Sequence, residues 1–95
     1  MKIALVGSTG LVGGTILDVI KERNFLFKEL FLVASETSIG KQINFLQKNY
    51  SVIAIEEALK LNVDIAIFSA GRDIALKWAP KFAKNGSVVI DNSSA

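Results

Sequence analysis

The opening stretch MKIALVGSTGLVGGTIL, residues 1–17, decides the fold. A short apolar run, Lys2–Val6, leads into glycines at positions 7, 10, 13 and 14, which are four of the seven glycines in a chain of 95 residues. From Leu11 to Arg23 the apolar residues recur at helical spacing, with charged residues on the opposite side. A buried strand that ends at a glycine and runs into a helix predicts the start of a βαβ unit.

The spacing Gly7-x-x-Gly10-x-x-Gly13 is a variant of the dinucleotide-binding fingerprint. Gly7 permits the tight turn, Gly10 lets the backbone approach a pyrophosphate, and Gly13 lets the helix lie close to the strand. The free N–H groups around Thr9–Val12 and the positive end of the helix dipole then face the anion. The motif therefore favours nucleotide binding, and a plain strand-to-helix turn without a ligand is the alternative.

The rest of the chain continues the alternation of strands and helices. Three further apolar strands and two further helices are predicted, at Glu29–Ala34, Asp64–Ala70 and Ser87–Asp91 for the strands and at Glu56–Leu61 and Asp73–Asn85 for the helices. Strands that are apolar on both faces predict a mostly parallel sheet with helices on both faces. The fold class is thus α/β and Rossmann-like, in a single dinucleotide-binding domain over residues 1–95.

Two local features modify this plan. Between Ile43 and Ile55 two β-rich runs flank Gln47-Lys48-Asn49, which predicts a small β-hairpin insertion. In the last helix Pro80 lacks an N–H and crowds the preceding turn, so it should kink the helix or weaken a turn. Trp78 in the same helix is interpreted as a packing residue.

Composition excludes several classes of function. Eleven basic and nine acidic residues are interspersed and give a net charge of +2, so no nucleic-acid partner is expected. The chain has no cysteine and no histidine, so no catalytic residue and no metal site are expected in it. No apolar run approaches the roughly 20 residues that span a bilayer, and the start does not resemble a signal peptide, so no membrane partner and a cytoplasmic location are expected. A hydrophobic fraction of 51% and a mean hydropathy of +0.41 predict a surface that something outside this chain covers.

The strand ends indicate where a ligand would lie, since ligands of open α/β sheets bind at the carboxyl ends of the strands. After the second strand the sequence has Ala34-Ser35 in place of the acidic residue of many NAD sites, and Thr37, Ser38 and Lys41 follow after Glu36. Hydroxyls and a lysine favour a 2′-phosphate, and a solvated surface loop is the alternative. After the third strand, small residues up to Gly71 would let a cofactor lie close to the backbone. After the fourth, Asn92 and Ser93 would supply hydrogen bonds.

Three segments together resemble the N-terminal part of aspartate-semialdehyde dehydrogenase. They are GSTGLVG (7–13), ASETSIGK (34–41) and FSAGRDIALKWAPKFAKNGSVVIDNSSA (68–95), and the resemblance covers essentially the whole chain. The N-acetyl-glutamyl-phosphate reductases share the glycine turn and the reaction logic. The segments SAG and DNSSA favour the first family.

The resemblance implies NADPH-dependent reductive dephosphorylation of β-aspartyl phosphate to aspartate semialdehyde. That step leads to lysine, methionine and threonine, and to diaminopimelate in bacteria. By resemblance, the pyrophosphate would be held by Thr9, Gly10, Leu11, Val12 and Gly13, the 2′-phosphate by Ser35, Thr37 and Ser38, and the nicotinamide end by Gly71, with Asn92 near the active site. The parent enzyme would be a homodimer or homotetramer.

The sequence departs from the family pattern in two ways. Many members have an arginine where this chain has Thr37, so a preference for NADP over NAD of only about tenfold is expected. The family's nucleophilic cysteine, its histidine and its substrate-binding arginines lie beyond DNSSA, so the chain resembles the first quarter to third of the enzyme and should be inactive alone. A free-standing nucleotide-binding or interaction module is the competing hypothesis.

Overall fold

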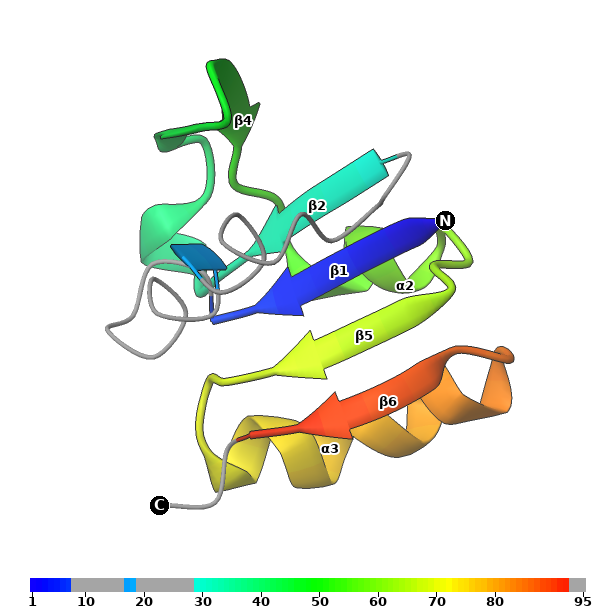
Figure 1. Ribbon diagram of the computed structural model, residues 1–95. Coiled ribbons are helices and arrows are strands. Elements are labelled where there is room, and N and C mark those ends of the chain that lie inside the picture. The colour runs from blue at the N-terminus through cyan, green and yellow to red at the C-terminus, as the bar shows by residue number, and fades with distance from the viewer. Residues whose placement is uncertain (8–16, 19–28, 93–95) are drawn as a thin grey trace.

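The computed structural model of the chain describes residues 1–7, 17–18 and 29–92 (Figure 1). Four parallel strands form one sheet in the order β2-β1-β5-β6, and a two-stranded antiparallel sheet pairs β3 with β4. The parallel strands are β1 (Lys2–Val6), β2 (Glu29–Val33), β5 (Ile65–Phe68) and β6 (Val88–Asp91). The other elements are the 3-10 helix η1 (Glu36–Ser38), β3 (Gln42–Phe45), β4 (Lys48–Ser51), α2 (Ile55–Leu59) and α3 (Arg72–Lys84). The predicted parallel α/β architecture with a small hairpin is confirmed.

Each face of the sheet has its own hydrophobic cluster, because successive strand residues point to opposite faces. On one face Ile3 and Leu5 pack with Leu17 and with Phe45 of the hairpin. On the other face Ala4, Val6 and Phe68 pack with residues of α2 and α3, and Figure 1 shows both helices on this same side of the sheet. Phe68 and Phe82 meet edge to face there, with ring centroids 5.6 Å apart. Burial on both faces explains why the two central strands, β1 and β5, are apolar along nearly their whole length.

The predicted helix at residues 11–23 lies mostly outside the described residues. Of it the structure describes Leu17 and Asp18, which are helical, with Leu17 buried and Asp18 exposed. In the described part of the chain, no helix combines the length and apolar character needed to cross a membrane.

Some element bounds differ from the prediction at strand ends. The third predicted strand, Asp64–Ala70, is shorter as β5, Ile65–Phe68. Asp64 precedes it, and its carboxylate accepts the backbone N–H of Lys2 at 2.7 Å. Beyond Phe68 the parallel pairing with β1 stops, since β1 ends at Val6, which is the partner of Phe68.

The hairpin turn lies earlier than predicted. The turn residues are Leu46 and Gln47, with φ of 52° and 64°, whereas Lys48 and Asn49 already belong to β4. Phe45 pairs with Lys48 across the turn, and the side-chain amides of Asn44 and Asn49 are hydrogen-bonded at 3.1 Å. The prediction of a turn at 47–49 was wrong because it relied on polar residues, whereas this register lets Phe45 reach the core.

Pro80 lies inside α3, which continues through it to Lys84. The helix continues past the proline, and the expected kink or weakened turn stays a prediction. Phe82, two residues later, is fully buried against the sheet and fixes that end of α3 by packing.

Candidate functional site

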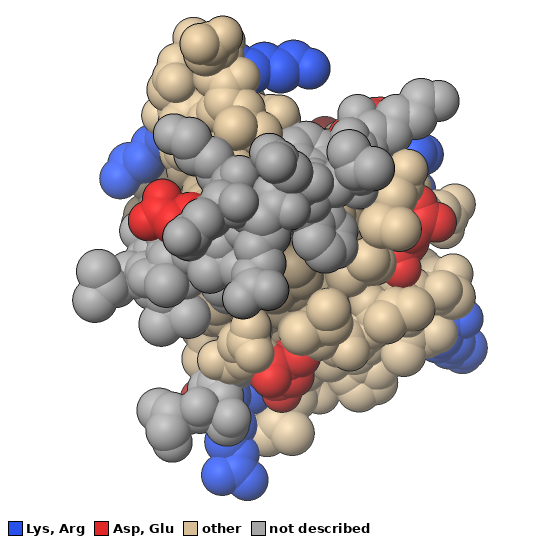
Figure 2. Space-filling model, in the orientation of Figure 1, with Lys and Arg blue, Asp and Glu red and all other residues tan. Residues whose placement is uncertain are grey.

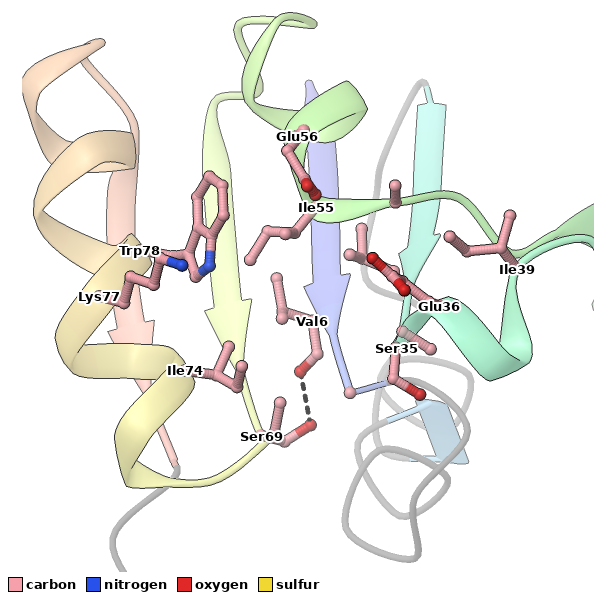
Figure 3. A pocket seen from close by; sticks show the side chains of 15 residues that line it. Val6, Ser35, Glu36, Ile39, Ile55, Glu56, Ser69, Ile74, Lys77 and Trp78 are labelled. Atoms are coloured by element: carbon pink, nitrogen blue, oxygen red, sulfur yellow. Dashed lines mark hydrogen bonds between the residues drawn. The ribbon is translucent and has the colours of Figure 1, made fainter.

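A cleft of about 550 Å³ lies on the side of the sheet that carries α2 and α3 (Figure 3). The ends of β1 and β2 form its floor, and α2 and α3 form its side walls. Ser69 and Ala70, the segment after β5, close one end. The lining is mainly apolar, and the volume of the cleft is within the range of small-molecule and cofactor sites. It thus lies where ligands of open α/β sheets bind.

Gly7 is the one member of the fingerprint that the structure describes, and it has a steric role. Its φ is +98°, and its N–H donates to the carbonyl of Val33 at 2.7 Å. A Cβ at this position would lie 2.8 Å from the carbonyl carbon of Ser69 and 2.9 Å from the backbone nitrogen of Ala70. Only glycine lets the end of β1 lie this close to the segment after β5. Thr9, Gly10, Leu11, Val12 and Gly13 lie outside the described residues.

The end of β2 brings two of the three predicted 2′-phosphate residues together. The hydroxyls of Ser35 and Thr37 are hydrogen-bonded to each other at 3.0 Å and both residues are exposed, although only Ser35 lines the cleft. Ser38 is buried in η1 with 8% of its surface exposed. Glu36, which lies between Ser35 and Thr37 in the sequence, also lines the cleft.

Gly71 and Asn92 both lie at the carboxyl edge of the sheet but outside the cleft lining. Gly71 is exposed and directly precedes α3. The backbone N–H of Asn92 donates to the carbonyl of Phe68 at 2.8 Å, which places Asn92 beside the end of β5. Gly71 therefore lies at the end of the segment after β5, and Asn92 lies beside the start of that segment.

The cleft carries charge of both signs. Glu36 and Glu56 line it, and within the described part of the chain neither carboxylate has a hydrogen bond or ion pair to another residue. Lys77 also lines it, with its ammonium 5.6 Å from the ring centroid of Trp78. The ammonium of Lys81 lies 4.4 Å from the same ring.

On the opposite face of the molecule, the described Lys and Arg side chains are spread around the rim (Figure 2).

Several lining residues could not be identified from sequence. Ile55, Ile74 and Trp78 come from inward-facing positions of α2 and α3, where an apolar residue is normally part of the core. Trp78 does pack against the core on this face, as predicted, and it also lines the cleft. The sequence signal for a nucleotide site was confined to glycines and strand ends.

Comparison with known proteins decides the family. A family model described as semialdehyde dehydrogenase, NAD binding domain, matches residues 2–95. The chain belongs to this family. The aspartate-semialdehyde dehydrogenase of Aquifex aeolicus is 55% identical over 99% of this chain.

Solved structures agree with this membership of the semialdehyde dehydrogenase family. Aspartate semialdehyde dehydrogenase II from Vibrio cholerae matches with a TM-score of 0.89 and 48% identity, over 98% of this chain and 30% of that one. A probable aspartate-semialdehyde dehydrogenase from Pseudomonas aeruginosa matches with a TM-score of 0.92 and 30% identity, over 98% of this chain and 28% of that one. The chain spans 28% of the length of its Aquifex relative.

The described residues fit the nicotinamide cofactor that the family name implies. Gly7 holds the turn against the segment after β5 with no space for a side chain, and the cleft beside it is apolar enough to take a base. Ser35 lines the cleft at one end, and its hydroxyl is hydrogen-bonded to that of Thr37. A semialdehyde dehydrogenase domain would thus offer a cofactor both an apolar cleft and polar groups at its edge.

Proposed function

We propose that the chain is the NADP-binding domain of an aspartate-semialdehyde dehydrogenase, which reductively dephosphorylates β-aspartyl phosphate to aspartate semialdehyde. The observation that carries the proposal is the cleft beside Gly7 at the carboxyl ends of β1 and β2. The names of the relatives support the reaction. The reaction belongs to the biosynthesis of lysine, methionine and threonine, and of diaminopimelate in bacteria.

The binding roles are distributed along the edge of the sheet. The segment Thr9–Gly13 holds the pyrophosphate with its backbone N–H groups, and Gly7 fixes the start of that segment. Ser35, Thr37 and Ser38 form the 2′-phosphate end. Gly71 lies at the nicotinamide end, with Asn92 toward the reacting carbon. The bound cofactor supplies the hydride.

The chain itself supplies binding and orientation rather than covalent chemistry. It contains no cysteine and no histidine, the side chains that most often serve as nucleophile and proton carrier in acyl transfer. The nucleophile and the acid–base group therefore come from the parts of the parent enzyme that the chain does not include. We propose that this parent is a cytoplasmic homodimer or homotetramer.

The end of β2 sets the choice between NADP and NAD. Hydrogen bonds to a charged group contribute roughly 1.5–3 kcal/mol each, and the paired hydroxyls of Ser35 and Thr37 are placed to make two. Glu36 opposes them, since its carboxylate lines the same cleft and would repel a phosphate. Ser38 contributes less than its sequence position suggests, because it is buried. The net expectation is a preference for NADP of about tenfold, or ~1.4 kcal/mol.

Titration calorimetry of the chain with NADP and with NAD tests this proposal. Thr37→Arg should widen the preference well beyond tenfold, because a guanidinium can bind a phosphate through two hydrogen bonds. Gln47→Arg adds the same charge at the exposed hairpin turn, away from the cleft, and should leave the ratio unchanged. Equal affinity for both dinucleotides in the wild type, or an unchanged ratio in Thr37→Arg, would overturn the 2′-phosphate assignment. Absence of binding by either would overturn the cofactor function.

A further inference from the structure

The peptide unit between Val6 and Gly7, where β1 ends, is held by hydrogen bonds from both sides. The carbonyl of Val6 accepts the backbone N–H of Ser69 at 2.8 Å and the hydroxyl of Ser69 at 3.0 Å (Figure 3). The N–H of Gly7 donates in the opposite direction, to the carbonyl of Val33 at 2.7 Å. The residue after β5 and the last residue of β2 therefore fix both polar groups of this peptide unit.

Only one of the two hydrogen bonds from Ser69 depends on its side chain. The backbone N–H lies at the end of the parallel pairing of β1 with β5, so any residue other than proline could donate it. A carbonyl oxygen has two lone pairs, and the hydroxyl donates to the same oxygen as the N–H. Serine at this position thus adds a hydrogen bond that alanine cannot make.

Ser69 also packs tightly against the second residue of the peptide unit. A Cβ on Gly7 would lie 2.8 Å from the carbonyl carbon of Ser69, so the two backbones are closer than a residue with a Cβ permits. In a close-packed contact a shift of one partner moves the other. The hydroxyl that holds Ser69 against Val6 therefore also holds Gly7 in place.

We propose that Ser69 is a positioning residue, whose hydroxyl fixes the peptide unit from which the segment proposed to hold the pyrophosphate begins. The inference rests on the proposed function and adds a residue that acts on cofactor binding through the backbone of β1. Backbone N–H groups bind an anion best when their positions are set beforehand, because the ligand then does not bear the cost of ordering them. The proton of the Ser69 hydroxyl is donated to Val6, so this role needs no contact with the cofactor.

The experiment removes the hydroxyl with Ser69→Ala and measures binding of NADP and of ADP by calorimetry. The two ligands share the diphosphate, so both affinities should fall by about fivefold, the effect of one neutral hydrogen bond. A direct contact of Ser69 with the nicotinamide half would weaken NADP binding alone. Ser69→Thr returns the hydroxyl and should recover most of the loss for both ligands.

Ser87 provides the matched control, because its hydroxyl also donates to a backbone carbonyl beside a strand end, that of Val63 at 2.6 Å. The two residues precede β6 and β5, so this hydrogen bond lies at the edge of the sheet opposite the cleft. Ser87 is buried, so Ser87→Ala should lower the urea midpoint of unfolding at least as much as Ser69→Ala does. Its affinities for NADP and ADP should equal those of the wild type.

A second measurement needs no ligand. Amide hydrogen exchange reports local opening, and the Gly7 N–H donates to Val33 within the fixed peptide unit. In Ser69→Ala the Gly7 amide should exchange about fivefold faster relative to the slowest amides of the sheet, because one restraint on the peptide unit is lost. In Ser87→Ala this ratio should remain that of the wild type.

The outcomes distinguish this inference from the function on which it rests. If the wild type binds neither ligand, the proposed cofactor function is wrong and the inference falls with it. If the wild type binds both and Ser69→Ala keeps its affinities, or loses affinity for NADP alone, the cofactor function stands and the positioning role is overturned. An equal loss of affinity in Ser87→Ala, or unchanged exchange of Gly7 in Ser69→Ala, also overturns it.

Discussion

Two glycines with nearly the same backbone conformation differ in what surrounds them. Gly7 has φ of +98° and Gly40 has φ of +89°. A Cβ on Gly7 would collide with the backbone of Ser69 and Ala70 at 2.8–2.9 Å, whereas a Cβ on Gly40 would meet nothing within 4 Å. The pair therefore separates the cost of a left-handed backbone from the cost of a steric collision.

We predict that Gly7→Ala lowers the free energy of unfolding by about 2–6 kcal/mol, because backbone strain and overpacking act together. Gly40→Ala is the control and should lose about 1–2 kcal/mol, from the backbone conformation alone. Urea denaturation of the three proteins measures both values. Losses of equal size would show that the close approach of the two strand ends contributes nothing to stability.

For single residues, the sequence indicates on which strand end or helix a side chain lies, but not whether that side chain is buried, exposed or part of the cleft. Ser35, Thr37 and Ser38 share one predicted role because all three carry a hydroxyl just after a strand end and because the family resemblance implies that role. The 3-10 helix then buries Ser38 and leaves the other two exposed, and no local pattern indicates which hydroxyl turns inward. Trp78 shows the same limit, since an aromatic residue on a helix has one sequence pattern whether it faces core or cleft.

Among the elements, the hairpin carries the least favourable turn. Leu46 and Gln47 both have positive φ, as a two-residue type I′ turn requires, yet neither is one of the residues that adopt it readily. Sequence could not place this turn because its residues lack the usual Asn-Gly signal. The parallel strands were predictable for the opposite reason, since each is apolar on both faces and ends near a glycine or a polar residue.

We predict that the double substitution Leu46→Asn, Gln47→Gly raises the free energy of unfolding by about 1–2 kcal/mol, because Asn-Gly adopts this turn without strain. Leu46 is 47% exposed, so little packing is lost. Lys48→Gly, one residue further along in β4, should instead lose about 0.5–1 kcal/mol, since glycine weakens a strand. Thermal unfolding monitored by circular dichroism compares the three proteins, and a destabilised double variant would contradict the proposed turn strain.

For the molecule as a whole, the two faces of the sheet are covered unequally at β6. Val88 and Ile90 pair in register with Ile65 and Ile67, so they belong to the face that carries Leu17. They are 62% and 43% exposed, and no described residue covers them. Val89 points the other way and packs with the cluster beneath α3. The apolar surface predicted from composition includes this strip.

We predict that Val88→Lys changes the free energy of unfolding by no more than about 0.5 kcal/mol and lowers self-association of the chain, because it removes an exposed apolar group from an edge strand. Val89→Lys, its neighbour on the opposite face, should lose about 2–4 kcal/mol, since it buries a charge. Sedimentation velocity and urea denaturation measure the two effects. Equal losses in the free energy of unfolding at both positions would show that the two faces of β6 do not differ in burial.

The strand order also determines how long β1 lacks one of its two neighbouring strands while the chain is being synthesised. β1 lies between β2 and β5, and β5 begins about 60 residues after β1 ends. At about 5–20 residues per second, β1 waits about 3–12 s for its second neighbour after it has been synthesised. Throughout that interval one hydrogen-bonding edge of β1 has no partner strand, so the nascent chain exposes an unpaired apolar edge on which another extended chain could pair.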